Sequence, residues 1–574
     1  MPSTRSPDEE SHWVDSSWGL NSWWEWWESP TWPWYDWFKG LSRCISFVIT
    51  ALRIYLSYKL APVHGSPAEQ ETQRAKVNKR CAQRALDLVL SMKGYYIKAA
   101  QTLCGAGVFA EEFDDAFAEL LDQCPREPFN VVRDILEAEL GCAISAVFSE
   151  FEKEAIAAAS IGQVHLGRLL DGTEVAVKVQ YPDVERFFRM DVRGLEFLFW
   201  LQGMGEKVRE ICDSMGLQFE AEFDYTREAR HLREVAANVL PHFHDRICIP
   251  LPLDAAHPIC SRLGVKSLCA RKVLTMERVK GVPIRVHTLQ LIDAFAKMHG
   301  TTPAELRKLI RTRGANADPA LVQRLLAMEP VRERTAVAAI GAVRLWNAAG
   351  QLAHRVCCCC PAIGARPQSV AVPLNGPRIA RTLFEVHGHE IFQDGVYNSD
   401  PHAGNIFMLT DGRLGLLDYG AVSRLSLEER LSLARLIVAV ADEDDDSVPE
   451  AMFACGFQSE RMDRRLALLL GYICFHRGPH PEDIKRLGSK VGLPEDCDVM
   501  SLEDYVAGGK LDEITRFPAQ LLSLQRCSMI LSGTALELGA GRLSSAQMLR
   551  PQAALLLQEH AKAGASGAVK GSAV

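Results

Sequence analysis

The segment from Asp400 to Gly420 constrains the fold more than any other part of this 574-residue chain. It begins with Asp-Pro-His-Ala-Gly-Asn and ends with Leu-Leu-Asp-Tyr-Gly. Between them, the apolar runs 406–409 and 414–417 flank a Thr-Asp-Gly-Arg sequence, which predicts a β-hairpin. Such a hairpin would bring Asn405 and Asp418 side by side, with Asp400 five residues before Asn405.

These three side chains suit phosphoryl transfer from a nucleotide. The reaction uses one carboxylate near the attacking group, and an amide oxygen and a second carboxylate that hold Mg²⁺ against the triphosphate. Asp400, Asn405 and Asp418 would supply these groups in that order, with the Asp-to-Asn spacing of a kinase catalytic loop. Taken singly, each has an ordinary explanation, because Asp-Pro and Asp-Tyr-Gly also form turns and Asn caps helices.

An apolar strand that contains a lysine indicates the same chemistry. Residues 172–180 predict a turn followed by a strand, with Lys178 at the phosphate-binding position of the kinase Val-Ala-Ile-Lys motif. Such a lysine needs an acidic partner, and the helix predicted over 219–239 offers four: Glu220, Glu222, Asp224 and Glu228.

The glycine-rich loop that should precede this lysine is replaced by an alanine-rich run over 155–163. Because alanine disfavours positive φ, the nucleotide geometry should differ from that of an ordinary protein kinase.

Together these motifs resemble the UbiB/aarF-domain (ADCK) family of atypical kinases. The family's Lys-x-Gly-Gln motif also appears, as Lys98-Ala99-Ala100-Gln101, with Ala100 in place of glycine. The resemblance covers about Ala75 to Gln180, Asp213 to Pro283 and Arg378 to Gly539. It implies an α+β, bilobal protein-kinase-like fold with an N-terminal helical extension and a mostly helical large lobe.

The resemblance also implies roles for individual residues. The catalytic residues would be Asp400, Lys178 and Glu228, and the Mg²⁺ ligands would be Asn405 and Asp418. The ATP-binding residues would be Ala157, Ala158, Ala159, Ser160, Lys178, Met276 and Glu277. A regulatory lid over the site where a peptide substrate would enter would comprise Lys98, Gln101, Glu222 and Asp224.

Such a site implies a Mg²⁺-dependent ATPase or kinase in prenyl-quinone or other lipid metabolism, and not a general protein kinase. Two alternatives stay open. One is a catalytically silent scaffold whose nucleotide switches partner binding, because Asn398-Ser399 stands where ordinary kinases have His-Arg before the catalytic Asp. The other is a small-molecule phosphotransferase of the aminoglycoside or choline kinase type, which shares the Asp-to-Asn spacing.

The N-terminal region suggests contact with a membrane. Nine of the eleven tryptophans fall between Trp13 and Trp37, and indole rings favour the membrane–water interface. The following apolar segment, 41–60, has its longest uncharged run at 44–52, well short of the roughly 20 residues that span a bilayer. The sequence therefore predicts a helix lying in the interface, or else a disordered aromatic tail followed by a helix docked on the protein.

The location in the cell is predicted less directly. Acidic residues outnumber basic ones before residue 41, which disfavours a simple cleaved transit peptide. The resemblance implies an intracellular protein of a mitochondrion or plastid. The net charge of −8 argues against a nucleic-acid partner.

The predicted organisation has seven parts. They are a disordered Trp-rich tail (1–40), an amphipathic helix and linker (41–74), a helical extension (75–150), a small lobe (151–283), an insertion (284–377), a large lobe (378–557) and a disordered tail (558–574). The 17 cysteines are scattered and indicate reduced thiols. The exception, Cys357 to Cys360 near His354, is open to three interpretations: half of a zinc site, an acylation site or an unconstrained loop.

Overall fold

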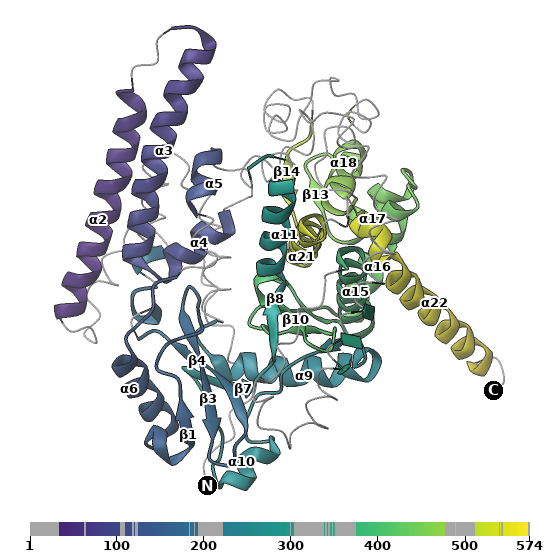
Figure 1. Cartoon of the computed structure of the whole chain (residues 1–574). Helices are drawn as coiled ribbons and strands as arrows, with labels where there is room; N and C mark the ends of the chain where they lie inside the picture. Colours follow the sequence, from purple (N-terminus) through teal and green to yellow (C-terminus); the bar gives the residue numbers. More distant parts are fainter. Residues whose placement is uncertain are drawn as a thin grey trace. The chain divides into compact units, whose positions relative to one another are not determined.

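The structure is a computed structural model that mixes helices and sheets, as the sequence predicts (Figure 1). It describes residues 34–61, 65–103, 110–117, 120, 124–182, 184–188, 190–192, 222–298, 300–302, 375–476, 488, 511–538, 540 and 543–571, and a few isolated positions between 338 and 349. The chain forms two compact units: Met1–Pro125 with Pro182–Gly216, and Arg126–Tyr181 with Leu217–Val574.

The smaller unit is helical. It contains α2 (Trp34–Lys59), α3 (Pro67–Met92), α4 (Tyr95–Leu103) and α5 (Glu111–Phe117), and α3 contacts the other three. Proline suits the first position of α3, because the N–H that it lacks would have no partner inside the helix. The helix α2 begins at Trp34, inside the stretch 1–40 that was predicted to be disordered; the residues before it lie outside the described part of the chain.

Two residues with positive φ, Lys93 and Gly94, separate α3 from α4. The first residues of α4 are buried in this unit. The ring of Tyr95 lies edge-on to Phe188 at 5.5 Å, and that of Tyr96 lies 5.1 Å from Phe47. Aromatic contacts thus fix the start of the helix that carries the Lys-x-x-Gln motif.

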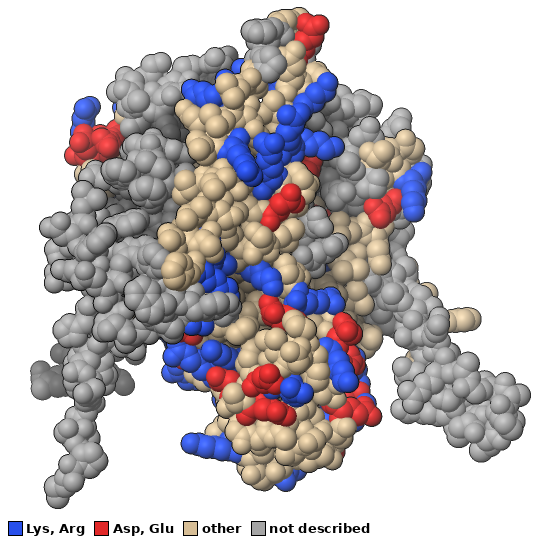
Figure 2. Space-filling view, turned by 90° about the vertical axis from the view of Figure 1, so that its left-hand side faces the viewer, with Lys and Arg blue, Asp and Glu red and all other residues tan. Residues whose placement is uncertain are grey.

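One side of α2 exposes large apolar side chains. Five of them recur at spacings of three, four or seven residues along one face, and all are at least 42% exposed: Phe38, Ile45, Ile49, Leu52 and Leu56. Figure 2 shows the molecule from the left-hand side of Figure 1, and residues without charge cover much of the described surface in this view. The segment Phe38–Lys59 is long and apolar enough to cross a membrane, although signal sequences and buried helices of soluble proteins pass the same test.

The larger unit contains a six-stranded sheet. Its strands run in the order β1 (Phe148–Phe151), β3 (Gly162–Leu169), β4 (Glu174–Gln180), β7 (Val273–Glu277) and β6 (Cys269–Ala270), with β2 (Ala157–Ala158) paired to β3. Every pairing in it is antiparallel. On β4, Val175, Val177 and Val179 join a buried apolar core with side chains from α6 (Phe129–Leu140) and α10 (Pro258–Leu263). Because side chains alternate along a strand, Lys178 projects from the opposite face.

The helix α9 (Tyr225–Phe243) contacts β6 and β7. The Asp224 carboxylate accepts a hydrogen bond of 2.9 Å from the Thr226 N–H and caps the helix N-terminus. The helix therefore starts six residues later than the predicted start at 219.

A second sheet carries the hairpin. Its order is β5 (Ile247–Cys248), β11 (Leu414–Leu416), β10 (Ile406–Leu409) and β8 (Gly281–Pro283). Ile406 lies opposite Leu416, and the Leu417 N–H donates to the Asn405 carbonyl at 3.1 Å. The predicted hairpin is confirmed. Two shorter pairs are formed by β9 (Val396–Asn398) with β12 (Val422–Arg424), and by β13 (Gln458–Ser459) with β14 (Ile514–Arg516).

Helices complete this unit. They are α11 (Ile284–Met298), α15 (Gly376–His389), α16 (Leu427–Ala441), α17 (Ser447–Ala454), α18 (Arg464–Phe475), α21 (Ala519–Glu537) and α22 (Ser545–Gly571). Short helical turns lie at η3 (Ile144–Ala146), η5 (Glu390–Asp394) and η6 (Ala403–Asn405). α22 contacts α15, α16 and α21.

The helix α22 continues to Gly571, through most of the stretch 558–574 for which the sequence predicts a disordered tail. The alanines of this stretch are the physical reason, because alanine has the highest helix propensity.

Candidate active site

The centre of the candidate site is Lys178 on β4. Its Nζ lies 3.0 and 2.9 Å from the two carboxylate oxygens of Glu228 on α9, and 3.5 Å from Oδ2 of Asp418. Of the four acidic residues that the predicted helix offered, the structure pairs Glu228 with the lysine. The same ammonium lies 4.9 Å from the ring centroid of Tyr225, within the range of a cation–π contact.

The pKa values of Lys178 and Glu228 depend on their burial and on the neighbouring charges. Burial by itself lowers the pKa of Lys178, but Asp418 and Glu228 outweigh it and hold that pKa well above its usual value. Burial raises the pKa of Glu228 to about 7, against the attraction of Lys178. The Asp418 side chain is 35% exposed, whereas that of Glu228 is 5% exposed. The ammonium therefore stays charged and joins a buried carboxyl group to an accessible one.

Four polar contacts fix the loop that contains Asp418. The Gly420 N–H donates to Oδ1 of Asp418 at 2.8 Å, and Nδ2 of Asn398 donates to the Asp418 carbonyl at 2.8 Å. The Tyr419 side chain points into the core, where its hydroxyl donates to Oε1 of Glu390 at 2.9 Å. Its carbonyl lies 3.2 Å from Nδ1 of His231 on α9. These contacts set the position of the Asp418 carboxylate.

Asp400 follows β9. Its N–H donates to Oδ1 of Asn398 at 2.9 Å, and its Oδ2 forms an ion pair of 3.0 Å with Nη2 of Arg526 on α21. Downstream, Nδ2 of Asn405 lies 3.1 Å from Nε2 of His402. The backbone of Asn405 pairs with that of Leu417, the residue before Asp418. The hairpin therefore brings the backbone of Asn405 close to Asp418, as the sequence predicts.

The alanine-rich run forms β2 and the tight connection into β3. Ala157 and Ala159 are exposed, Ala158 is half-buried and Ser160 is buried. The Ala159 N–H donates to the carbonyl of Gly162 at 2.7 Å. A Cβ at Gly162 would lie 2.5 Å from the Val179 carbonyl and 2.7 Å from the Tyr225 hydroxyl, so only glycine fits there.

Met276 and Glu277, two of the predicted ATP-binding residues, end β7. Met276 is buried opposite Ala176 of β4. The Glu277 N–H donates to the Leu251 carbonyl at 3.0 Å, and one Glu277 carboxylate oxygen accepts from the Leu251 N–H at 3.1 Å. The Glu277 N–H therefore already has a backbone partner.

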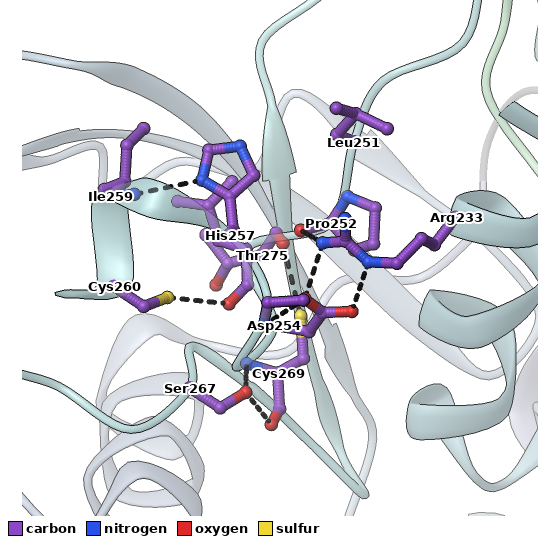
Figure 3. Close-up of polar contacts among 12 residues, drawn as sticks. Arg233, Leu251, Pro252, Asp254, His257, Ile259, Cys260, Ser267, Cys269 and Thr275 are labelled. Atoms are coloured by element: carbon purple, nitrogen blue, oxygen red, sulfur yellow. Dashed lines mark hydrogen bonds and ion pairs between the residues drawn. The ribbon is translucent and has the colours of Figure 1, made fainter. Parts of the chain in front are cut away.

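A polar cluster joins α9 to the loop beside β7 (Figure 3). Nε of Arg233 donates to Oδ2 of Asp254 at 2.8 Å, and its Nη2 donates to the Pro252 carbonyl at 3.1 Å. The Cys269 thiol donates to the Thr275 carbonyl of β7 at 3.4 Å, and burial raises its pKa to about 12. We assign the cluster a structural role, because the Cys269 thiol stays protonated and the Arg233 guanidinium is paired with the Asp254 carboxylate.

The four predicted lid residues lie in different units. Lys98, which is half-buried, and Gln101 belong to α4 of the smaller unit. Glu222 and Asp224 belong to the larger unit, where the Asp224 side chain caps α9. Their role as a lid stays a prediction.

Sequence reasoning missed two residues near the site, Glu390 and Arg526. Neither belongs to a local motif around Asp400 or Asp418, so no short-range pattern points to them. The cysteine cluster Cys357–Cys360 and His354 lie outside the described residues. Among the described residues, no three His, Cys, Asp or Glu side chains gather as a metal site.

Comparison with known proteins shows which family this chain is similar to. The ABC1 atypical kinase-like domain matches residues 119–319 and 368–452 and leaves 320–367 unmatched, within the predicted insertion 284–377. The chloroplastic protein ACTIVITY OF BC1 COMPLEX KINASE 1 of Arabidopsis thaliana is 26% identical over 67% of this chain and 44% of its own length. AarF domain-containing protein kinase 1 of Xenopus laevis is 34% identical over 35% of this chain and 40% of its own length.

Among solved structures, the complex of Rv3197 with erythromycin from Mycobacterium tuberculosis aligns with a TM-score of 0.44 at 20% identity, over 82% of this chain and 95% of that one. The chain spans less than half the length of the two curated relatives named above. The domain match falls on the elements that carry Lys178, Glu228 and Asp418, and the chain belongs to the UbiB/AarF family of ABC1 atypical kinase-like proteins.

Proposed function

We propose that this protein binds ATP with Mg²⁺ and acts as an ATPase or as a kinase of a small or lipidic substrate, not as a general protein kinase. The observation that carries the proposal is the contact of Lys178 with both Glu228 and Asp418. In phosphoryl transfer, a lysine oriented by a helical glutamate holds nucleotide phosphates, and a neighbouring aspartate holds the metal.

The donor atoms at the site fit Mg²⁺, which prefers oxygen ligands. Asp418 and Asn405 would hold it, and the ion would supply positive charge against the phosphate oxygens. Lys178 would bind the phosphates, and Asp400 would accept the proton of the attacking group. The adenine would lie in a hinge between two lobes, near Met276 and Glu277, and the phosphates under the loop Ala157–Ser160. Lys98, Gln101, Glu222 and Asp224 would form a lid against peptide substrates.

We propose that the substrate is a lipid, and prenyl quinones are the first class to test. The exposed apolar face of α2 supports it, because such a helix can lie in a membrane interface. The chloroplast relative supports an organellar location, in a plastid or mitochondrion.

One observation favours a second candidate, a nucleotide-switched scaffold without turnover. The Asp400 carboxylate is paired with Arg526, and an ion-paired carboxylate is a weaker base.

The test is ATP hydrolysis by the full chain with and without Mg²⁺ and anionic liposomes, beside Asp418→Asn and with thermal shift by ATP measured in parallel. The proposal expects hydrolysis that requires Mg²⁺ and falls by about 100-fold or more in Asp418→Asn, as metal and electrostatic groups in such sites contribute several kcal/mol. A nucleotide-induced thermal shift without hydrolysis would favour the scaffold. Absence of any nucleotide effect would refute both candidates.

A further inference from the structure

Asp400 has a cationic partner that no motif of the sequence indicated. Nη2 of Arg526 lies 3.0 Å from Oδ2 of Asp400, although the two residues are separated by 126 positions in the chain. The Asp400 side chain is 15% exposed and that of Arg526 is 33% exposed. The ion pair is therefore mostly shielded from water at the aspartate, while part of the guanidinium stays accessible.

The helix α21 is fixed firmly at this point. One turn before Arg526, the Ser523 hydroxyl lies 2.8 Å from the Tyr397 hydroxyl and 2.7 Å from that of Ser423. These partners belong to β9 and β12, the strands that flank the two aspartate loops. Leu524 and Cys527 are fully buried on either side of Arg526. These hydrogen bonds and buried side chains fix the turn of α21 that carries Arg526.

The electrostatics of the proposed site call for a cation at this position. A terminal phosphate near the Asp400 carboxylate would be repelled by it, and a cation beside that carboxylate offsets the repulsion. A guanidinium has five N–H donors in a planar fork, so one group can contact a carboxylate and a phosphate oxygen together.

We infer that Arg526 binds the terminal phosphate of the nucleoside triphosphate and holds Asp400 beside it. The inference rests on the proposed function and adds a binding residue to that site. α21 lies beyond the residues that the ABC1 domain matches, which end at 452, so this contact is a contribution of the rest of the chain.

The test compares two nucleotides that differ in the terminal phosphate. Affinities for ADP and for the β,γ-imido analogue of ATP, both with Mg²⁺, would be measured by calorimetry on the full-length protein. In Arg526→Ala the analogue should bind about tenfold to 100-fold more weakly, the range expected for hydrogen bonds to a charged group, while ADP affinity stays unchanged. Arg526→Lys should recover part of the loss, because it restores the charge without the fork.

Two further variants sharpen the result. Arg516→Ala removes the same charge from an exposed position on β14 and should change neither affinity. Asp400→Asn releases Arg526 from its ion pair and should strengthen binding of the analogue relative to ADP. This variant also keeps the test open if Arg526→Ala does not fold.

The outcomes separate the inference from the function on which it rests. If the unaltered protein binds neither nucleotide, the proposed function fails. If it binds both, and Arg526→Ala weakens both equally or strengthens the analogue, the inference is overturned: the arginine then only supports the fold or restrains Asp400.

Discussion

At the scale of single residues, the position of the two aspartate loops depends on a buried carboxyl group, that of Glu390. Glu390 is fully buried and accepts hydrogen bonds from the Asn398 N–H at 3.1 Å and from the Tyr419 hydroxyl at 2.9 Å. Asn398 precedes Asp400 by two residues, and Tyr419 follows Asp418. One carboxyl group therefore joins the two loops that carry the aspartates, and we assign Glu390 a positioning role.

Lys178→Ala should weaken nucleotide binding by at least tenfold and lower the free energy of unfolding. The variant leaves Glu228 buried without its ammonium partner, and breaking such a pair costs about 3–5 kcal/mol, less whatever protonation of Glu228 recovers. Calorimetric nucleotide titration and urea unfolding measure the two effects. Lys266→Ala, at an exposed position, is the matched control. Unchanged nucleotide affinity in Lys178→Ala would count against this site.

Glu390 should make stability depend on pH. Burial raises the pKa of Glu390 to about 8 from its usual value of 4.5, so between these pH values the folded protein binds more protons than the unfolded chain. Its contribution to the free energy of unfolding must then fall as pH rises through this window. Glu390→Gln does not titrate, and its stability relative to the unaltered protein should rise between pH 5 and 8.

Urea unfolding at several pH values tests this prediction. Glu559→Gln removes one carboxyl group from an exposed position on α22 and is the control. Parallel pH profiles for Glu390→Gln and the unaltered protein would show that Glu390 does not hold a proton in the fold.

At the scale of elements, α9 is fixed on two sides. Arg233 joins it to the loop beside β7 through Asp254 (Figure 3). On its other side, Glu234 forms a two-point ion pair with Arg424, and His231 contacts the Tyr419 carbonyl. Because Glu228 lies on the same helix, these contacts hold it within reach of Lys178.

Arg233→Ala should loosen this attachment. It removes a partly buried ion pair and a hydrogen bond to the Pro252 carbonyl, and we expect about 1–2 kcal/mol of lost stability after allowing for solvent screening. Nucleotide affinity should fall with it, because Glu228 loses part of its support. Arg262→Ala breaks an exposed pair with Asp171 and should cost at most about 1 kcal/mol.

A double-mutant cycle of Arg233→Ala with Asp254→Asn isolates the pair. No coupling between the two positions, or nucleotide binding untouched by Arg233→Ala, would contradict the role that we assign to this contact.

At the scale of the whole molecule, the chain combines a helical unit with a unit that carries the candidate active site. The helical unit bears the exposed apolar face of α2, and we expect it to attach the protein to membranes. Such a face gains free energy by leaving water, by roughly 1.5–3 kcal/mol for each large side chain that becomes fully buried.

The double variant Ile49→Asp with Leu52→Asp should reduce binding to anionic liposomes by more than tenfold, because both side chains lie on the exposed face and would carry charge into the interface. Liposome co-sedimentation measures the effect. Thr72→Asp with Ser91→Asp adds the same charge at exposed positions of α3 and is the control. Equal loss in both double variants would mean that charge alone, and not the apolar face, governs attachment.

Short-range patterns in the sequence determined the hairpin between Asn405 and Asp418, the strand that carries Lys178 and the order of the acidic groups. Turn chemistry and the alternation of side chains act over a few residues, so they are legible without a fold. Tertiary structure alone decided that Glu228, out of four acidic candidates, meets the lysine, since this pairing depends on how α9 packs against β6 and β7. It also decided that Arg526 meets Asp400 and that Glu390 joins both loops. These contacts depend on how distant helices pack, and packing has no local signature in the sequence.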